Sequence, residues 1–413
     1  MTDYQTVHDF ICGQVPTMLK EPRAFIRYPF VDPGSVYDGN VWDWDTYWSV
    51  YGLLSIAGDL PPALCEQVIT HAKGNIANFM DHQLPDGYIP MMIEVANWPE
   101  PYLNMRRKEG VKLNMMKPFL CGQIRMIAAH LNDWSWASGY LPGMEAYFAC
   151  YEREYFHANC GLYGWHDDIM IGMDNDPASF GRPNDSTANI FLNAFMAAEL
   201  ACMAEALEAF GDPARAAVYR QKREALIAAV QRECWDARDG FFYSVDVDIH
   251  TRPYDWFHQG LGVFWKSLPI KIRVWSGFIP LWAGFATPAQ AARMAAHSLD
   301  ESTFASPYGV TTLAKDEKMF DLSVTNNPSN WLGPVWIVAN YVVFKGLLDY
   351  GHRAEAKRIL DGTLRLLAED VKRSGQLHEY YDPFTGQPIM NGGFINWNIL
   401  ALTMQKEWEA VGC

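Results

Sequence analysis

NDSTANIFLNAFMAAELACMAEALEAF-GDP-ARAAVYRQKREALIAAVQREC, residues 184–234, is the stretch that decides the fold. Its apolar residues recur at helical spacing from Ile190 to Leu207, after a cluster of N-cap residue types at 184–187. Gly211 ends this pattern, and Pro213 fits the first position of a second helix. The stretch therefore predicts helices at 184–210 and 213–234, joined as a hairpin by a tight turn.

The same pattern recurs along the chain, in pairs separated by long loops rich in Gly, Pro and aromatic residues. Loops longer than ~12–15 residues in a compact domain usually carry function. Because no composition shift or flexible linker divides the chain, residues 1–413 are predicted to form a single domain. The simplest architecture is one all-α domain of paired helices, and an (α/α)6 toroid fits it, with the long loops gathered at one end of a central funnel. The lack of a tight sequence repeat favours the toroid over a solenoid only weakly. Further helices are expected near 44–57, 61–80, 117–132, 142–156, 276–285, 288–299, 334–350, 353–369 and 394–410.

Composition and charge exclude several kinds of partner. The net charge of −15 argues against nucleic acid and anionic membranes, both of which bind basic surfaces. No apolar run approaches the ~20 residues of a membrane-spanning helix, and the N-terminus lacks the layout of a signal peptide. The eight cysteines include no Cys-x-x-Cys pair, which indicates reduced, mostly buried thiols and a cytoplasmic protein. Association into a homo-oligomer is compatible with these features.

Two carboxylates far apart in the sequence lie in similar surroundings. Asp174 lies in Gly172-Met173-Asp174-Asn175-Asp176-Pro177, and Glu379 lies in His378-Glu379-Tyr380-Tyr381-Asp382-Pro383. Both segments lie between helical patterns, so the fold can bring them to one face. Paired acids among Trp and Tyr are what glycoside hydrolysis requires, because one protonates the leaving oxygen while the other activates water or attacks directly. The segment 166–168 offers rival acids, and the spacing after Asp174 does not fit a calcium loop.

Aromatic residues make up 14% of the chain and include 16 Trp. Most of them must build the core, but many Trp fall in Gly-, Pro- and Asn-rich segments, where core helices would not place them. Flat aromatic faces suit sugar rings, and ligand pockets favour aromatic walls. In Trp42-Asp43-Trp44-Asp45 two carboxylates alternate with indoles at a helix start, which predicts hydroxyl binding by Asp45 first and Asp43 second. The Trp in these Gly-, Pro- and Asn-rich segments include Trp42, Trp44, Trp48, Trp98, Trp165, Trp256, Trp331, Trp336 and Trp397.

Signatures of other chemistries are missing from the sequence. It contains no Gly-rich phosphate loop, no His-Glu-x-x-His and no Gly-x-Ser-x-Gly. The 11 histidines show no metal-ligand spacing. We therefore expect neither a metal nor a cofactor.

Six short strings carry a resemblance to a known family. Trp44-Asp45-Thr46-Tyr47-Trp48 is similar to the pattern Trp-Asp-Ser-x-Phe, and Lys117–Gln123 is similar to a helix start with Gln-Pro-Pro. Gly172-Met173-Asp174-Asn175 is similar to the end of Glu-Ser-Gly-Met-Asp-Asn, with Met170-Ile171 in place of Glu-Ser.

The other three strings complete the order. Asp86–Pro90 is similar to a pocket loop, and His378–Pro383 is similar to Glu-Asn-Tyr-Asp-Pro. Asn330–Trp336 resembles Asn-Trp-Arg-Gly-Pro-Val-Trp, with Leu332 in place of Arg. From about residue 37 to 410 the chain resembles glycoside hydrolase family 63, particularly its short bacterial mannosylglycerate and glucosylglycerate hydrolases. It is more distantly similar to the family 37 trehalases.

The resemblance implies an (α/α)6 toroid, inversion at the anomeric carbon and no catalytic metal. It implies that Asp174 is the general acid and Glu379 the general base. It places sugar binding on Trp44 and Asp45, pocket lining on Tyr88 and a hydroxyl contact on Gln123. Further substrate contacts are expected from Trp42, Asp43, Trp331, Trp336, Tyr381 and Trp397.

We therefore predict an inverting, exo-acting α-glycosidase for a small α-glucoside or α-mannoside. Burial among Met and aromatic residues should raise the pKa of Asp174 and keep it protonated, while Glu379 stays ionised. Inversion requires the two carboxyl groups to lie ~6.5–9.5 Å apart, whereas ~5–5.5 Å would mean retention. An anionic aglycone such as glycerate would need a cation, and neutral α-glucosides fit as well. The candidate cations are Arg182, Arg106, Arg107, Lys108 and Lys112.

Two other functions fit the same fold. A sugar isomerase or epimerase would remove a carbon-bound proton and would favour a histidine base such as His258 or His378. A carbohydrate-binding protein would retain the aromatic site without catalysis. Loss of activity in Asp174 and Glu379 variants, rather than in histidine variants, would distinguish hydrolysis from both.

Overall fold

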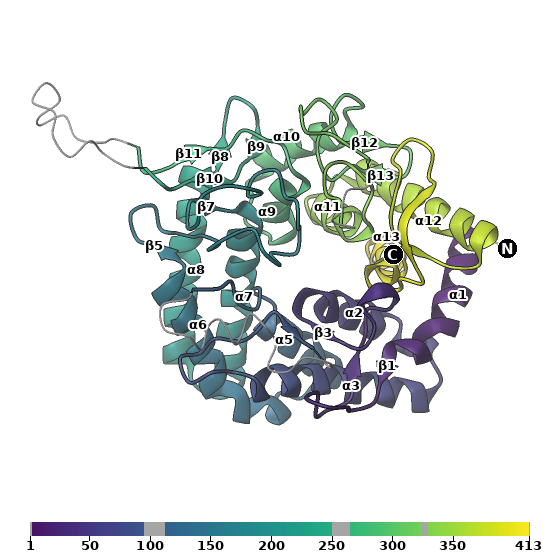
Figure 1. Cartoon of the computed structure of the whole chain (residues 1–413), viewed down its shortest axis with the longest axis horizontal. Coiled ribbons are helices and arrows are strands. Elements are labelled where there is room, and N and C mark those ends of the chain that lie inside the picture. Colours follow the sequence, from purple (N-terminus) through teal and green to yellow (C-terminus); the bar gives the residue numbers. More distant parts are fainter. Residues whose placement is uncertain (1, 95–111, 250–264, 324–328, 413) are drawn as a thin grey trace, which may run out of the picture.

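The computed structural model describes residues 2–94, 112–249, 265–323 and 329–412. Within these ranges six helices form a closed ring, in which each packs on the next and the last packs back on the first (Figure 1). The predicted all-α toroid is therefore confirmed. The inner helices are α2 (Asp43–Ser55), α5 (Leu120–Leu131), α7 (Ile190–Ala209), α9 (Ile279–Trp282), α11 (Ile337–Asp349) and α13 (Leu400–Gly412).

A second layer of helices surrounds this ring. Helix α8 packs along α7, and α12 packs along α11, as the predicted hairpins require. The first helix, α1, packs on α12 and α13 and was not predicted from the sequence. The outer helices are α1 (Asp3–Met18), α3 (Pro62–Asp81), α6 (Leu141–Glu154), α8 (Pro213–Glu233), α10 (Pro288–Leu299) and α12 (Arg353–Ser374).

The helices of the two layers differ in how much of their surface is buried. Eleven of the 13 residues of α11 are buried, whereas only five of the 21 residues of α8 are. A helix that is apolar all round must be covered on every side, while an amphipathic helix buries one stripe. Helix α7 corrects the expectation about apolar runs, since by length and composition alone it could cross a membrane. However, 78% of its most apolar window is buried inside the protein, where it serves as an inner helix of the ring.

Several predicted helices differ in extent, and α12, for example, ends at Ser374 instead of 369. Helix α7 begins at Ile190 instead of 184, and its N-cap is Asn189, whose side chain accepts a hydrogen bond from Phe191 N. The predicted N-cap residue Asp185 instead has φ 59° and pairs with Lys112 and His166. The segments predicted at 276–285 and 394–410 begin as the 3-10 turns η5 (Trp275–Phe278) and η6 (Asn396–Ile399).

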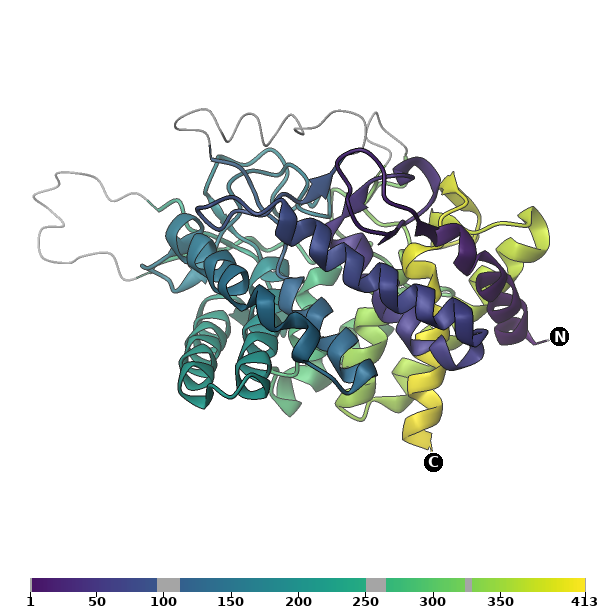
Figure 2. The ribbon, with the colours of Figure 1, turned by 90° about the horizontal axis from the view of Figure 1, so that it is seen from below.

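Short antiparallel strand pairs order the loops, which gather over one end of the ring (Figure 2). Two of these pairs carry site residues. They are β3 (Val41–Trp42) with β4 (Met92–Ile93), and β14 (His378–Tyr381) with β15 (Pro388–Gly392). The others are β1 (Leu19–Lys20) with β2 (Phe30–Val31), β5 (Phe156–His157) with β6 (Leu162–Tyr163), β8 (Trp235–Asp236) with β9 (Phe241–Phe242), β12 (Ala305–Ser306) with β13 (Gly309–Val310), and β10 (Val245–Asp246) between β7 (Thr187–Ala188) and β11 (Leu268–Pro269).

Candidate active site

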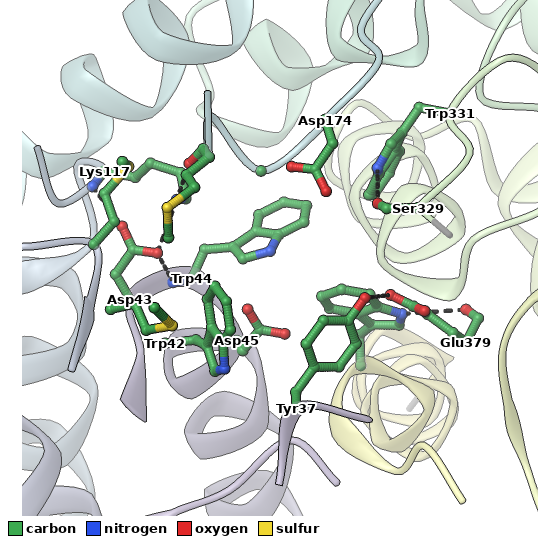
Figure 3. Close-up of a pocket in the computed structure, with 15 residues that line it drawn as sticks. Tyr37, Trp42, Asp43, Trp44, Asp45, Lys117, Asp174, Ser329, Trp331 and Glu379 are labelled. Atoms are coloured by element: carbon green, nitrogen blue, oxygen red, sulfur yellow. Dashed lines mark hydrogen bonds and ion pairs between the residues drawn. The ribbon is translucent and has the colours of Figure 1, made fainter. Parts of the chain in front are cut away.

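A cavity of about 320 Å³ opens at the loop end of the ring. Four carboxylates and four indoles contribute to its wall, together with a single lysine among the residues that the structure describes. In Figure 3 the carboxylates of Asp174, Asp45 and Glu379 all turn toward the same space. The cavity is lined by Tyr37, Trp42, Asp43, Trp44, Asp45, Met91, Met92, Lys117, Met170, Gly172, Asp174, Ser329, Trp331, Glu379 and Trp397.

Asp174 lies on the loop between β6 and β7, and the next residue fixes that loop to another. Asn175 accepts a hydrogen bond from Trp331 N (2.7 Å) and donates one to Asn330 Oδ1 (3.1 Å). Gly172, two residues before Asp174, has φ +99°, a conformation that residues with a side chain rarely adopt. The loop that carries Asp174, called the acid loop below, is therefore joined by hydrogen bonds to the segment Asn330–Trp331 on the cavity wall.

Burial controls the ionisation of Asp174. Removal from water raises the pKa of this carboxyl, because the charged form loses solvation. Lys117 and a hydrogen bond with Ser329 act in the opposite direction but do not cancel the effect. A carboxyl with a raised pKa that faces a cavity can donate a proton, as a general acid must.

Glu379 lies in β14 and is only 1% exposed. Tyr37 donates a hydrogen bond to its Oε1 (2.8 Å), and Asn391 donates one to its Oε2. Burial raises the pKa of Glu379 to about 7, and the charge of Asp174 adds to this, although both hydrogen bonds lower it. Glu379 therefore changes charge near neutral pH, where a general base works best.

Asp45 and Trp44 form the floor of the cavity. Asp45 Oδ1 accepts a hydrogen bond from Asn396 Nδ2 (2.5 Å), and Ser49 donates to Asn396 Oδ1 (2.8 Å). Burial raises the pKa of Asp45 well above its usual range. The Trp44 ring lies 5.3 Å from the ring of Trp397 and 5.8 Å from that of Trp331, centroid to centroid, which makes a rigid aromatic wall.

Asp43 and Lys117 form an ion pair that is almost completely buried. Their side chains are 1% and 3% exposed, and Lys117 Nζ lies 2.8 Å from Asp43 Oδ1. Asp43 also accepts hydrogen bonds from the backbone N–H groups of Trp44 and Lys117, both at 2.7 Å. Lys117 Nζ donates to Met170 O (3.0 Å), on the loop that carries Asp174. Asp43 thus acts mainly as an anchor between α2, the start of α5 and the acid loop.

Five predicted substrate contacts do not line this cavity, and three of them are held by other parts of the protein. Tyr88 is buried and donates its hydroxyl proton to Asn114 O (2.9 Å). Gln123 is buried within α5 and donates to Thr46 Oγ1 (3.2 Å). Arg182 donates to Thr187 Oγ1 (3.0 Å) and pairs with Asp246. The printed hydrogen bonds of these side chains therefore go to other parts of the fold, and Gln123 Oε1 is buried without a partner among the described residues.

Trp336 and Tyr381, the other two, lie behind the wall. The Trp336 ring stacks on Trp331 at 3.8 Å between centroids and on Tyr380 at 4.7 Å. The Tyr381 hydroxyl donates to Asp370 Oδ2 (2.9 Å). Trp336 therefore supports Trp331 from behind, and Tyr381, which follows a register shift between Tyr380 and Tyr381, turns toward Asp370.

The rival acids and bases have other partners. Asp168 accepts a hydrogen bond from Gly181 N (2.7 Å), and Asp176 accepts one from Asn189 Nδ2 (2.5 Å). His378 Nδ1 lies 2.8 Å from Asp370 Oδ2, outside the cavity lining, so the isomerase reading loses this base. Among the candidate cations, Lys112 pairs with Asp185. His258, Arg106, Arg107, Lys108, Trp98 and Trp256 lie outside the described residues.

Sequence reasoning missed three residues that act directly on the predicted catalytic machinery. Tyr37 and Asn391 hold Glu379, and Lys117 is the cation beneath the acid loop. Asn391 carried a weak signal, because it stands before two glycines in the segment that precedes the last helix. Nothing in the sequence indicates the role of Tyr37, since a lone tyrosine near the N-terminus has no pattern that points to a carboxylate 342 residues away.

The ring, the aromatic cavity and its paired carboxylates define the class: an (α/α)6 glycoside hydrolase. The chain belongs to the mannosylglycerate hydrolase MGH1-like glycoside hydrolase domain family, whose model matches residues 39–397. It is 31% identical over 166 residues to a mannosylglycerate hydrolase of Thermus thermophilus, a match that covers 40% of this chain and 32% of that protein. It is 30% identical over 166 residues to mannosylglycerate hydrolase MGH1 of Selaginella moellendorffii, covering 40% and 30%. The chain thus spans about a third of the length of these relatives.

Solved structures agree on the fold. The structure resembles that of GH63 mannosylglycerate hydrolase from Thermus thermophilus in complex with glucose, with a TM-score of 0.68 and 20% identity. That match covers 96% of this chain and 100% of the other. The neutral trehalase Nth1 from Saccharomyces cerevisiae gives a TM-score of 0.61 at 15% identity, covering 98% and 81%. The resemblance to family 63, and more distantly to trehalases, is therefore confirmed.

Proposed function

We propose that this chain is an inverting, exo-acting α-glycosidase that hydrolyses a small α-glucoside or α-mannoside. Asp174 is its general acid and Glu379 its general base. The observation that supports this most strongly is the meeting of two carboxylates with raised pKa values in one small aromatic cavity. Pockets for small ligands start at about 300 Å³, so a cavity of about 320 Å³ suits one sugar ring with a short aglycone.

In this mechanism the glycosidic C–O bond breaks as a water oxygen attacks the anomeric carbon from the opposite face. Asp174 gives its proton to the leaving oxygen, and Glu379 takes a proton from the attacking water. Trp42 and Trp44 offer aromatic surface to the sugar ring, and Asp45 accepts hydrogen bonds from its hydroxyls. Proton exchange with solvent then restores both carboxyl groups, so no oxidant, metal or covalent intermediate is needed.

The relatives suggest which substrates to try first. Two of them are named mannosylglycerate hydrolases, and one related crystal structure contains D-glycerate. Mannosylglycerate and glucosylglycerate are therefore the leading candidates, followed by neutral α-glucosides. Among described residues that line the cavity, Lys117 is the only cation, and Asp43 already pairs with it. Recognition of a glycerate carboxylate by the described residues would therefore have to involve neutral donors or the third N–H of Lys117.

The test is a proton NMR time course on glucosylglycerate, mannosylglycerate, trehalose, kojibiose and nigerose. We expect a β-anomer to appear first from at least one of them, which would establish both hydrolysis and inversion. Initial release of an α-anomer would keep the hydrolase and contradict inversion. No release from any of them, together with interconversion of free glucose and mannose, would favour an isomerase instead.

The two catalytic assignments are tested by Asp174→Asn and Glu379→Gln. Each should lower kcat by about 10²–10⁴-fold, the usual contribution of general acid–base catalysis. Asp168→Asn and Asp382→Asn are matched controls, because these nearby carboxylates accept backbone hydrogen bonds outside the cavity. Retention of full activity in both catalytic variants would refute the assignment.

Two broader proposals accompany this function. We propose that residues 1–413 act as a single domain, because the inner ring joins α2 to α13. We also propose a cytoplasmic location, since the seven described cysteines are all free thiols.

A further inference from the structure

The side chain of Glu379 is held from two sides by two segments of the chain that also hold each other. Tyr37 comes from η1 (Ser35–Tyr37), near the N-terminus, and Asn391 comes from β15. Each donates one hydrogen bond, and the two bonds reach different oxygens of the carboxylate. Figure 3 shows the Tyr37 hydroxyl pointing at Glu379 from the cavity wall.

The loop that carries Tyr37 is built around a buried carboxylate. Asp32, 0% exposed, accepts hydrogen bonds from Gly34 N (2.6 Å) and Gly39 N (2.5 Å), which closes the loop. Gly34 forms a bridge with Phe394, just beyond β15. A Cβ on Gly34 would lie 2.8 Å from Gly393 O, so only glycine permits this approach.

Asn391 stands directly opposite Glu379 in the hairpin. The register pairs His378 with Gly392 and Tyr380 with Met390, which places Glu379 and Asn391 between them on one face. Asn391 has φ +53°, a left-handed conformation that Asn tolerates better than most residues. Backbone strain of this kind persists where the surrounding structure holds it, often at functional sites. Here it aims an amide donor at the carboxylate.

We propose that Tyr37 and Asn391 are positioning residues that hold the Glu379 carboxylate ionised and aimed for its role as base. The proposal rests on the proposed function for its catalytic consequence. Hydrogen bonds donated to a carboxylate stabilise the charged form, and charge-assisted bonds are the stronger kind. They also fix the rotamer, which leaves the remaining lone pairs directed at the water to be activated.

Other titratable groups act on Glu379 and must be kept unchanged in the test. Asp174 and Asp45 face it across the cavity, and Tyr380 neighbours it on β14. The charge of Asp174 raises the pKa of Glu379, whereas the two hydrogen bonds lower it, and the charge of Glu379 in turn raises the pKa of Asp45. The two donors are therefore the groups that oppose both burial and like charge.

The experiment compares Tyr37→Phe and Asn391→Asp with the parent protein by two measurements. The first is the titration of Glu379 by ¹³C NMR in glutamate-labelled full-length protein, assigned by its absence in Glu379→Gln. The second is the pH profile of kcat/KM on the substrate found by the anomer assay. Tyr37→Phe removes one donor, and Asn391→Asp replaces a donor by a like charge while keeping a residue that tolerates the backbone conformation.

We expect the Glu379 titration to move upward by about one pH unit in Tyr37→Phe, and further in Asn391→Asp. Because only the ionised base is active, the acidic limb of kcat/KM should move by the same amount, a loss of about tenfold below pH 6. The matched controls are Tyr308→Phe, whose hydroxyl bonds to Thr385 O, and Asn132→Asp, which has φ +50° at the end of α5. Neither should move the titration or the acidic limb.

Unchanged titration of Glu379 in both folded variants would overturn the proposal. If no glycoside is hydrolysed, the proposed function is wrong, but the NMR titration still measures the effect of the two hydrogen bonds on Glu379 directly. A fall in kcat/KM at every pH without any shift of either measurement would show a merely structural role. Circular dichroism of each variant establishes folding first, and Tyr37→Phe keeps the test decisive if Asn391→Asp does not fold.

Discussion

Single residues in this protein are most constrained where charge is buried beneath the acid loop. Lys117 and Asp43 neutralise each other with almost no solvent, and Lys117 also holds Met170 O. Removal of one partner from a buried pair leaves the other charge without compensation, which costs far more than the pair contributes. The pair thus couples the integrity of the cavity floor to the placement of Asp174.

Lys117→Met should lower the free energy of unfolding by about 3–5 kcal/mol, measured by urea denaturation. It should also raise the pKa of Asp174, since Lys117 normally lowers it. The double variant Lys117→Met with Asp43→Asn should regain part of the loss, because no buried charge is then left unpaired. The ion pair between Lys345 and Asp349 lies at the surface and offers a matched control. Lys345→Met breaks this pair and should lower the free energy of unfolding by at most about 1 kcal/mol. Equal stability of the two single variants would contradict this account.

Whole elements also meet closely where the ring closes. Helix α2 packs on η6 and α13, so the first inner helix must fit against the last. Gly52 makes this fit possible, because a Cβ there would lie 2.2 Å from Cγ2 of Ile399. The hydrogen bond from Asn396 to Asp45 lies in the same seam and links closure of the ring to the floor of the cavity.

Gly52→Ala should therefore destabilise the protein by about 1–3 kcal/mol through overpacking, read from the urea midpoint. Ile399→Ala in the same chain should relieve part of this penalty, so the two effects should not add. Gly13→Ala is the control, because nothing lies within 4 Å of its Cβ and alanine favours the helix α1. The control should be stabilised by about 0.5–1 kcal/mol, and a loss as large as that of Gly52→Ala would refute the packing argument.

At the scale of the whole molecule, buried acids make stability depend on pH. Glu199, 2% exposed in α7, accepts hydrogen bonds from the N–H groups of Cys121 and Gly122 at the start of α5. Burial nevertheless raises its pKa to about 7 from an ordinary value of 4.5. Between these values the folded protein binds a proton that the unfolded chain has released. Stability from this group is therefore present below pH 4.5 and lost as the pH rises through about 7.

This loss should amount to about 3 kcal/mol between pH 4 and pH 8 for Glu199 alone, measured by denaturation across that range. Glu199→Gln should flatten the profile by that amount, because glutamine does not titrate. At pH 4 the variant should be less stable than the parent, since its amide group cannot accept the second backbone hydrogen bond, and this difference should shrink toward pH 8. A slope identical to that of the parent would show that Glu199 is not protonated in the folded state.

The sequence predicted what depends on local pattern and missed what depends on distant partners. The hairpin α7–α8 follows from its periodicity and from Pro213, and Asp174 and Glu379 meet at one cavity as predicted. Gln123 was expected at the substrate from the family resemblance, and Arg182 as a cation for an anionic aglycone. In the structure Gln123 is buried within α5 and Arg182 pairs with Asp246. A motif indicates the type of residue near a site, whereas the direction of each side chain depends on packing from other elements.

The ring can close only after nearly the whole chain has been synthesised. Asp45 cannot form its hydrogen bond with Asn396 until that residue, 351 positions later in the chain, has been made. At about 5–20 residues per second, a ribosome needs roughly 20–70 seconds to make that stretch. Throughout this interval α2, with ten of its 13 residues destined for the interior, has no neighbour on its far side. The unfinished ring thus exposes apolar surface that the finished ring buries, and this exposure lasts as long as translation of the stretch does.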